Sequence, residues 1–364
     1  MFFPVDKAIF RLKKAGFLVV LGLSAVFSGF SQANQAAKLE DTFTTFNDYA
    51  ADVGAAMAFL GGVGLAWSDP YIGHLINPIP HWGAGISLGI TTIGMTNLTK
   101  LNEFLQVEMA PFIGNKQMNL IWTAELRIGG FRGIPFDLGV KYGILPALPL
   151  FGETSYNINI VGGDLRFRVK NGYGIGPEIS VGLEFNLVNG GYDTPMYASI
   201  FEETTSSGTG RGYRITPNDG AIMSYKWNAT VIDFKVSLGK TFPSSRFTFY
   251  GGAKGGVALT QTTFAVTGPD VAWGLNGSGS NRLSQYTPTK WNTEPDKLQG
   301  FLPFGISTMT ADGISILFDG FAVNVQGHIG IAFDFDNRWH LSLAYMMDVL
   351  HFDSGISLSF RYQQ

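Results

Sequence analysis

The feature that most constrains the fold is a two-residue alternation of apolar and polar side chains. Between Met118 and Ile128, every second residue is apolar, and the intervening positions carry mostly polar or charged groups. The stretch from Phe136 to Ile144 repeats the pattern. Because successive side chains of a β-strand point to opposite faces, the alternation predicts strands with one apolar and one polar face.

The alternation recurs often enough to predict about ten strands over the chain. They lie at residues 82–93, 118–128, 136–144, 165–169, 179–187, 232–238, 247–259, 321–335, 339–345 and 356–362. A membrane β-barrel and a soluble β-sandwich both produce such strands, so a second observation is needed to separate them.

Composition and connection lengths favour the membrane barrel. The 364 residues are 14% aromatic and include 30 Phe and 47 Gly, with only 15% charged residues; the mean hydropathy is a modest +0.14. A lipid-facing barrel has this composition because only every second residue meets lipid and because glycine serves its turns. Short and long connections also alternate along the chain, as expected of short periplasmic turns and long outer loops. The short ones are 171–175, 240–245 and 336–337, and the long ones 145–154, 190–225 and 263–318.

Residues 1–33 are typical of a signal peptide. Four basic residues precede the apolar run from Ala15 to Phe30, and Ser31-Gln32-Ala33 supplies small residues for cleavage. The apolar run is shorter than a membrane span requires, which favours cleavage over a permanent anchor. Cleavage would leave 21 basic and 27 acidic residues, a formal net charge of −6. This balance gives no indication of nucleic-acid binding, and the lack of cysteine fits export.

Residues 34–80 form an N-terminal segment that the pattern leaves ambiguous. From Val53 to Trp67 the residues alternate well enough for a first strand, which would need a partner such as 104–113. Residues 46–60 are also rich in Ala and other helix formers. We therefore expect an all-β fold: an antiparallel transmembrane β-barrel of about 10–14 strands at residues 81–364, with a small helical or hatch segment in the pore or on its periplasmic side.

No motif predicts an enzyme, a cofactor or a metal site. The chain has no Cys, its five His are scattered, and its glycines punctuate strands instead of opening helices. His340-Leu341-Ser342 has the His-x-Ser spacing of outer-membrane phospholipases, but the flanking apolar residues turn this pair toward the lumen. We therefore interpret His340 and Ser342 as polar lining residues.

The polar faces of the strands identify candidate lumen-lining residues. They could set the selectivity of a channel, or pair across strands as a structural network in a narrow barrel. Arg166, Arg168 and Lys170 form the clearest ladder of one sign. The candidates are Glu125, Arg127, Lys141, Arg166, Arg168, Lys170, Glu184, Asp233, Lys235, Lys254, His328 and Arg361.

The chain resembles bacterial outer-membrane barrel proteins through its signal segment, its alternating strands and the ending Phe360-Arg361-Tyr362. That ending looks like the signal read by the barrel-assembly machinery, although Gln363 and Gln364 follow it. The glycine-rich residues 61–69 and Asn77-Pro78, ahead of a strand at Trp82, resemble the N-terminal hatch of the long-chain fatty-acid channel family. Position 79 is Ile where that family often has Ala. This resemblance implies passive uptake of hydrophobic molecules past a hatch.

These observations predict a multi-pass protein of the outer membrane. The leading hypothesis is a non-enzymatic, passive channel or transporter for small molecules. The alternatives are a non-conducting structural or surface-interaction barrel with adhesive outer loops, and a hatch-gated transporter of hydrophobic compounds. The expected partners are outer-membrane lipid and lipopolysaccharide-like glycolipid, the barrel-assembly machinery, and a small-molecule solute.

Overall fold

The computed structural model describes the strands and the lumen of the protein. The described residues are 37–38, 48, 52–64, 67, 81–94, 97, 112–113, 116–129, 135–151, 154–170, 176–195, 200–206, 209–216, 222–242, 245–267, 270–276, 308–310, 313–336 and 338–363. The predicted signal peptide lies outside these ranges.

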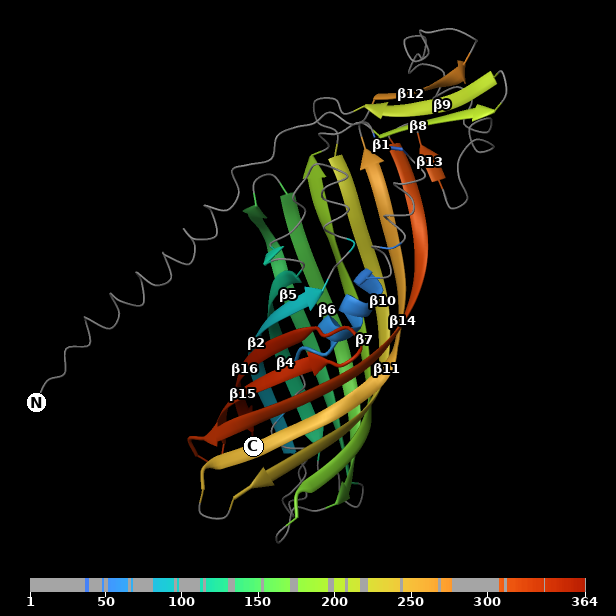
Figure 1. Ribbon diagram of the computed structural model, residues 1–364. Coiled ribbons are helices and arrows are strands. Elements are labelled where there is room, and N and C mark those ends of the chain that lie inside the picture. Colours follow the sequence, from blue (N-terminus) through green and yellow to red (C-terminus); the bar gives the residue numbers. More distant parts are fainter. Residues whose placement is uncertain are drawn as a thin grey trace, which may run out of the picture. The chain divides into compact units, whose positions relative to one another are not determined.

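Ten long strands form a closed antiparallel ring (Figure 1). Each strand pairs with its neighbour in the ring, and the first strand, β2, pairs with the last, β16. In ring order they are β2 (His81–Gly94), β4 (Lys116–Gly129), β5 (Phe136–Phe151), β6 (Thr154–Lys170), β7 (Glu178–Pro195), β10 (Ile222–Thr241), β11 (Phe247–Thr267), β14 (Gly313–Asp334), β15 (Trp339–Asp348) and β16 (Ser354–Gln363). The prediction of an all-β antiparallel barrel is confirmed, with a strand count at the lower end of the expected range.

Shorter strands occur in the connections. β3 (Phe112–Ile113) pairs with β4, and β13 (Thr308–Thr310) pairs with β14. A separate sheet has the order β1-β8-β9-β12, formed by β1 (Ala37–Lys38), β8 (Ile200–Ser206), β9 (Thr209–Thr216) and β12 (Asp270–Asn276). The two longest predicted loops therefore contain strands, and β9 of one pairs with β12 of the other.

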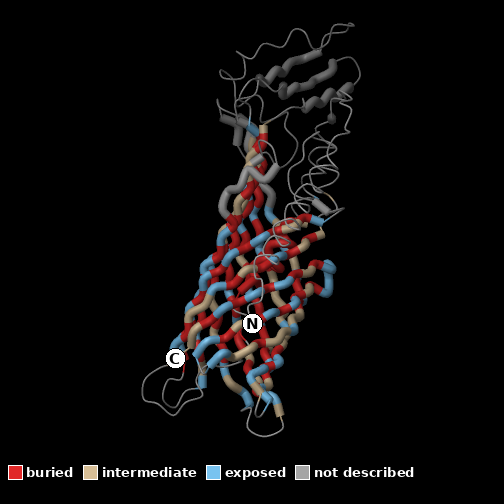
Figure 2. Tube along the Cα trace, turned by 90° about the vertical axis from the view of Figure 1, so that its left-hand side faces the viewer, coloured by how far each residue is buried: buried red, intermediate tan, exposed pale blue. Residues whose placement is uncertain are grey.

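The two faces of the ring differ as the alternation requires. On β7, Leu183, Phe185 and Leu187 are exposed, while Glu184 and Asn186 between them are buried. Figure 2 shows buried and exposed positions alternating along the strands. The apolar outer row of β7 runs over residues 179–187, a length that matches the roughly 9–11 residues of a tilted strand crossing a bilayer. The exposed apolar side chains thus form a belt for lipid.

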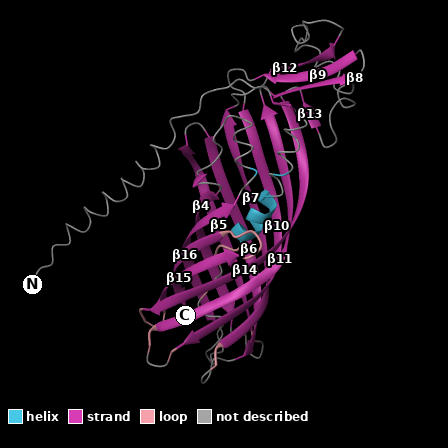
Figure 3. Cartoon of the chain, viewed as in Figure 1, coloured by secondary structure: helices cyan, strands magenta, loops and turns pink. Residues whose placement is uncertain are grey.

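One helix at residues 52–61 lies inside the ring (Figure 3). Val53, Met57, Phe59 and Leu60 are all at most 1% exposed, so the helix is surrounded on every side. A helix that is apolar around its whole circumference needs such a site. The alternative strand at Val53 to Trp67 is wrong, because residues 52–61 form a helix in the lumen instead of joining the wall. No helix in the described part of the chain is long and apolar enough to cross a membrane.

Candidate functional site

The lumen has a charged layer and an apolar layer. On β10, the inward residues are Asp233 and Lys235 toward the β10–β11 turn, and Trp227, Ala229 and Val231 toward the other end. β6 has the same division, with charged inward residues near its C-terminal end and apolar ones near its start. The charged layer therefore lies at the end of the barrel with the short turns.

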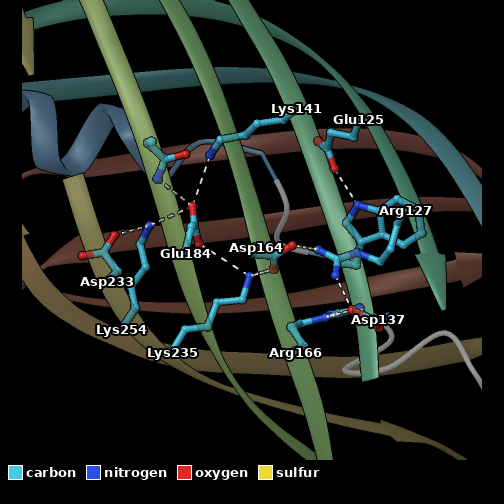
Figure 4. A network of polar contacts seen from close by, with 12 residues as sticks. Glu125, Arg127, Asp137, Lys141, Asp164, Arg166, Glu184, Asp233, Lys235 and Lys254 are labelled. Carbon is cyan, nitrogen blue, oxygen red and sulfur yellow. Dashed lines mark hydrogen bonds and ion pairs between the residues drawn. The ribbon is translucent and has the colours of Figure 1, made fainter. Parts of the chain in front are cut away.

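An arginine–aspartate chain forms one side of the charged layer. The Arg127 guanidinium contacts Asp137 Oδ1 through Nη1 at 2.5 Å and Asp164 Oδ1 through Nη2 at 2.6 Å. Arg166 donates to the two oxygens of Asp137, from Nε at 2.8 Å and from Nη2 at 2.7 Å. Asp164 also pairs with Lys235. Figure 4 shows these groups joined from strand to strand.

Glu184 is the centre of the other side. Its carboxylate lies 3.2 Å from Lys141 Nζ and 3.5 Å from Lys235 Nζ and from Lys254 Nζ. Lys254 Nζ also lies 3.4 Å from Asp233 Oδ2. Buried charges are tolerated when they are paired in this way, and removal of one partner is costly.

The register explains why lysines gather here. Asp164, Glu184 and Asp233 are direct cross-strand partners on β6, β7 and β10, so three carboxylates occupy one level of the wall. Like charges directly opposite each other are destabilising. Lys141, Lys235 and Lys254, which all reach this row, compensate the repulsion.

The predicted lining residues fall into three groups. Glu125, Arg127, Lys141, Arg166, Glu184, Asp233, Lys235 and Arg361 are buried. Lys254, His328 and Arg168 are half-buried, and Lys170 is exposed. The predicted ladder therefore runs from the buried Arg166 through the half-buried Arg168 to the exposed Lys170.

Asp137 and Asp164 were not among the predicted site residues, although they hold the arginines. The signal for both was available in the alternation. Asp137 occupies the polar face of its strand, and Asp164 lies one two-residue step before Arg166.

Polar groups of the wall bind the end of the helix. Lys141 Nζ donates to the carbonyl oxygens of Gly61 and, at 2.9 Å, Val63. Gln326 Nε2 donates to the carbonyl of Ala58 at 2.9 Å. The last carbonyls of a helix have no partner within it, so these donors satisfy groups that would otherwise be buried unpaired. We call residues 52–64 and Trp67 the plug.

The glycines of the plug and the wall allow close contact. Gly64 has φ +82°, a left-handed conformation that glycine adopts without strain. On the wall, a Cβ at Gly89 would lie 2.7 Å from Val63 Cγ1. The plug therefore occupies space that the wall leaves open by lacking side chains.

Several wall residues hold Trp67 in the plug. Its Nε1 donates to Glu125 Oε2 at 2.5 Å. The Arg127 Cζ lies 5.3 Å from the centre of its ring, and the Arg361 Cζ lies 5.1 Å away. Both distances suit cation–π attraction. Gly83 provides the close surface, since a Cβ there would lie 2.6 Å from the ring.

A cavity of about 30 Å³, room for one water molecule, lies between Gly62, Gly64 and wall residues including Lys254 and His328.

The His-x-Ser pair lies elsewhere on the inner wall. His340 Nδ1 is 2.6 Å from Asp334 Oδ1, and Ser342 Oγ accepts from Arg361 Nη2 at 3.2 Å. No cluster of acidic or histidine residues in the described ranges could hold a metal ion.

A closed antiparallel ring with an apolar outer belt and paired charges inside defines a membrane-spanning β-barrel of the outer-membrane class. The chain is a multi-pass protein of this class.

No protein-family model and no curated protein matches the chain. Among solved structures, it is similar to the translocator domain of the autotransporter NalP from Neisseria meningitidis, with 10% identity and a TM-score of 0.34 over 91% of this chain and 99% of that one. It is similar to a Pseudomonas aeruginosa FadL homologue, with 11% identity and a TM-score of 0.25 over 86% and 97%. It is also similar to the Ralstonia pickettii toluene transporter TbuX, with 9% identity and a TM-score of 0.26 over 85% of this chain and 97% of that one. At such scores the backbones do not superpose closely, so the class rests on the closed barrel itself.

Proposed function

We propose that the protein is a passive transporter of small molecules whose lumen is closed at rest by the plug. The observation that carries this proposal is the glycine lining opposite the plug. A barrel that served only as a scaffold could fill its lumen with side chains of its own strands, as small barrels do. Here the wall has Gly83 and Gly89 where the plug has Trp67 and Val63. Removal of the plug would therefore leave space in the lumen that no side chain at these two positions fills.

The charged layer supports transport of neutral or weakly charged solutes. Its cations and anions are paired with one another, so lysines compensate the row of Asp164, Glu184 and Asp233 and the row does not attract a particular ion. The apolar layer of the lumen, at the end of the barrel with the long loops, would contact the less polar parts of a solute. These features support a small solute with both polar and apolar parts.

A disulfide between plug and wall tests the proposal. The native chain has no cysteine, so Val63→Cys with Gly89→Cys adds the only thiols. A Cβ at Gly89 would lie 2.7 Å from Val63 Cγ1, which is close enough for a disulfide between cysteines at the two positions. Conductance in planar bilayers and solute uptake by proteoliposomes would be measured before and after reduction. We expect the oxidised protein to be silent and the reduced protein to conduct during the intervals in which the plug leaves the lumen.

A matched control joins two wall strands and leaves the plug free. Thr241 Oγ1 on β10 and Thr248 Oγ1 on β11 are 2.9 Å apart, so Thr241→Cys with Thr248→Cys can form a disulfide in the wall. This variant should conduct equally in both redox states. If the plug-locked protein conducts as well when oxidised as when reduced, the plug is not the gate and the proposal fails.

A second function is favoured by the sheet of β8, β9 and β12. Its strands come from the two longest connections of the barrel. A sheet built from outer loops could bind a partner at the cell surface. Replacement of residues 196–221 by a short turn would abolish cell-surface binding on this hypothesis and leave solute uptake unchanged. Equal surface binding by the shortened protein would exclude it.

A further inference from the structure

The site that holds Trp67 is a narrow slot in the inner wall, closed at one end by the carboxylate of Glu125. Three strands that are adjacent in the ring build it: β16 contributes Arg361, β2 contributes Gly83, and β4 contributes Glu125 and Arg127. The side chains of the two arginines and the glutamate are at most 5% exposed. The slot is therefore a buried site whose occupant in this structure is a side chain of the protein itself.

The two faces of the slot favour a planar aromatic ring. The guanidinium of Arg127 lies 5.3 Å from the centre of the Trp67 ring. The guanidinium of Arg361 lies 5.1 Å from the same centre. The absence of a side chain at Gly83 lets the ring approach the wall closely. Cation–π attraction of this kind strengthens when the charge is desolvated.

The end of the slot selects a ring with an N–H group. Glu125 Oε1 accepts from Ser87 Oγ at 2.5 Å and from Thr123 Oγ1 at 3.3 Å. These bonds orient the carboxylate so that Oε2 receives the indole N–H of Trp67 at 2.5 Å. A ring without a donor would leave that oxygen buried and without this bond, which is costly for a charged group. An anionic ring substituent at that end would face the carboxylate and be repelled.

We propose that this slot also binds a small planar compound with a ring N–H or an aromatic amine, of which indole is the simplest probe. Such a compound competes with Trp67 for the slot, and its binding releases the plug. The binding step stands on the slot alone. The release step rests on the proposed transport function, and it names the class of solute that opens the lumen by displacing the plug.

Binding is tested in a Trp67→Ala variant, where the slot lacks its native occupant. Indole and its isostere indene, which has no N–H, would be titrated into the detergent-solubilised protein by calorimetry. We expect indole to bind about ten-fold or more tightly than indene, as a hydrogen bond to a buried carboxylate implies. The added change Glu125→Gln should reduce this preference. Equal affinities for indole and indene in the Trp67→Ala variant would overturn the proposal.

A second buried tryptophan provides the matched control. Trp227 is 1% exposed and packs among Tyr156, Tyr192 and Tyr225. Within the described residues, no group accepts its Nε1 hydrogen. A variant that combines Trp227→Ala with Glu125→Gln, so that the Trp67 slot lacks its carboxylate, should therefore bind indole and indene alike. A preference for indole there as large as in the Trp67→Ala variant would mean that the Glu125 end is not the source of selectivity.

Release is tested in the unmodified chain. Indole should raise the conductance of the native protein, and indene should raise it less. Trp67→Phe keeps a ring but removes the N–H, so it provides a second variant if Trp67→Ala does not fold. In that variant, the conductance should rise at a lower indole concentration than in the native protein. An unchanged indole response would overturn the release step, while the calorimetric result would still decide the binding step. Loss of redox control in the plug-locked protein would show separately that the transport function fails.

Discussion

The Lys141→Met variant gives the most direct measure of how firmly the plug is held. Within the described structure, Lys141 is the wall residue whose charged donor binds two carbonyls of the plug, that of Gly61 at the end of the helix and that of Val63 two residues beyond it. A hydrogen bond to a charged group contributes about 1.5–3 kcal/mol net. Loss of both bonds should therefore favour displacement of the plug by about 3–6 kcal/mol. This corresponds to an increase of roughly two to four orders of magnitude in the equilibrium constant for displacement.

Chemical labelling of a buried plug residue measures that equilibrium. Ala58 is 0% exposed, and the native chain has no cysteine, so Ala58→Cys creates one site that a water-soluble maleimide reaches only when the plug leaves. When return of the plug is faster than labelling, the rate is proportional to the displaced fraction. We expect Lys141→Met to accelerate labelling by about two orders of magnitude or more.

Lys235→Met is the control for a general loss of lumen charge. Lys235 pairs with Asp164 and Glu184, which both belong to the wall. Its replacement should lower the stability of the barrel without a comparable acceleration of labelling at Ala58→Cys. If Lys141→Met labels no faster than the parent, or if both lysine variants accelerate labelling equally, the bonds from Lys141 do not hold the plug.

Three further predictions follow from single positions. Gly89→Leu places atoms against Val63, where overpacking costs about 1–3 kcal/mol, and should raise labelling of the plug in the same assay; an unchanged rate would contradict the close contact. Asp137→Asn removes the charge that two buried guanidiniums share and should lower the free energy of unfolding by about 3 kcal/mol, measured by denaturant titration; a loss below the error of that titration would show that the pair is not needed. In the turn after β15, burial first and then the nearby Asp348 raise the pKa of Asp353 from 3.8 to about 6. Since the folded pKa exceeds the unfolded value, the stability of this turn is greatest below about pH 4 and falls as the pH rises through 6; an NMR titration midpoint near 4 would refute this.

The wall was predictable because its signal is local. Strands such as β4 and β7 expose and bury alternate residues, and a period of two is visible in any sequence window. The helix was ambiguous because residues 52–61 satisfy both an alternating pattern and a helical one. What decides between them is the surrounding lumen, which accepts an element that is apolar on every side.

The site was only partly predictable because its pairings depend on register. Asp137 lies opposite Arg166, and Glu184 lies opposite both Asp164 and Asp233. A shift of one strand by two residues would keep every side chain on its face and change all of these partners. The environment of Trp67 was further out of reach, because its contacts come from β2, β4 and β16, which are distant in sequence.

The position of Trp67 also has a consequence for the order of assembly. The ring closes where β2 meets β16, the first strand with the last, and this junction forms only after the whole chain is present. Trp67 contacts Gly83 on one of these strands and Arg361 on the other. The aromatic ring thus acts as a clasp across the closing seam. Loss of this ring would therefore remove one contact from each of the two strands that close the barrel.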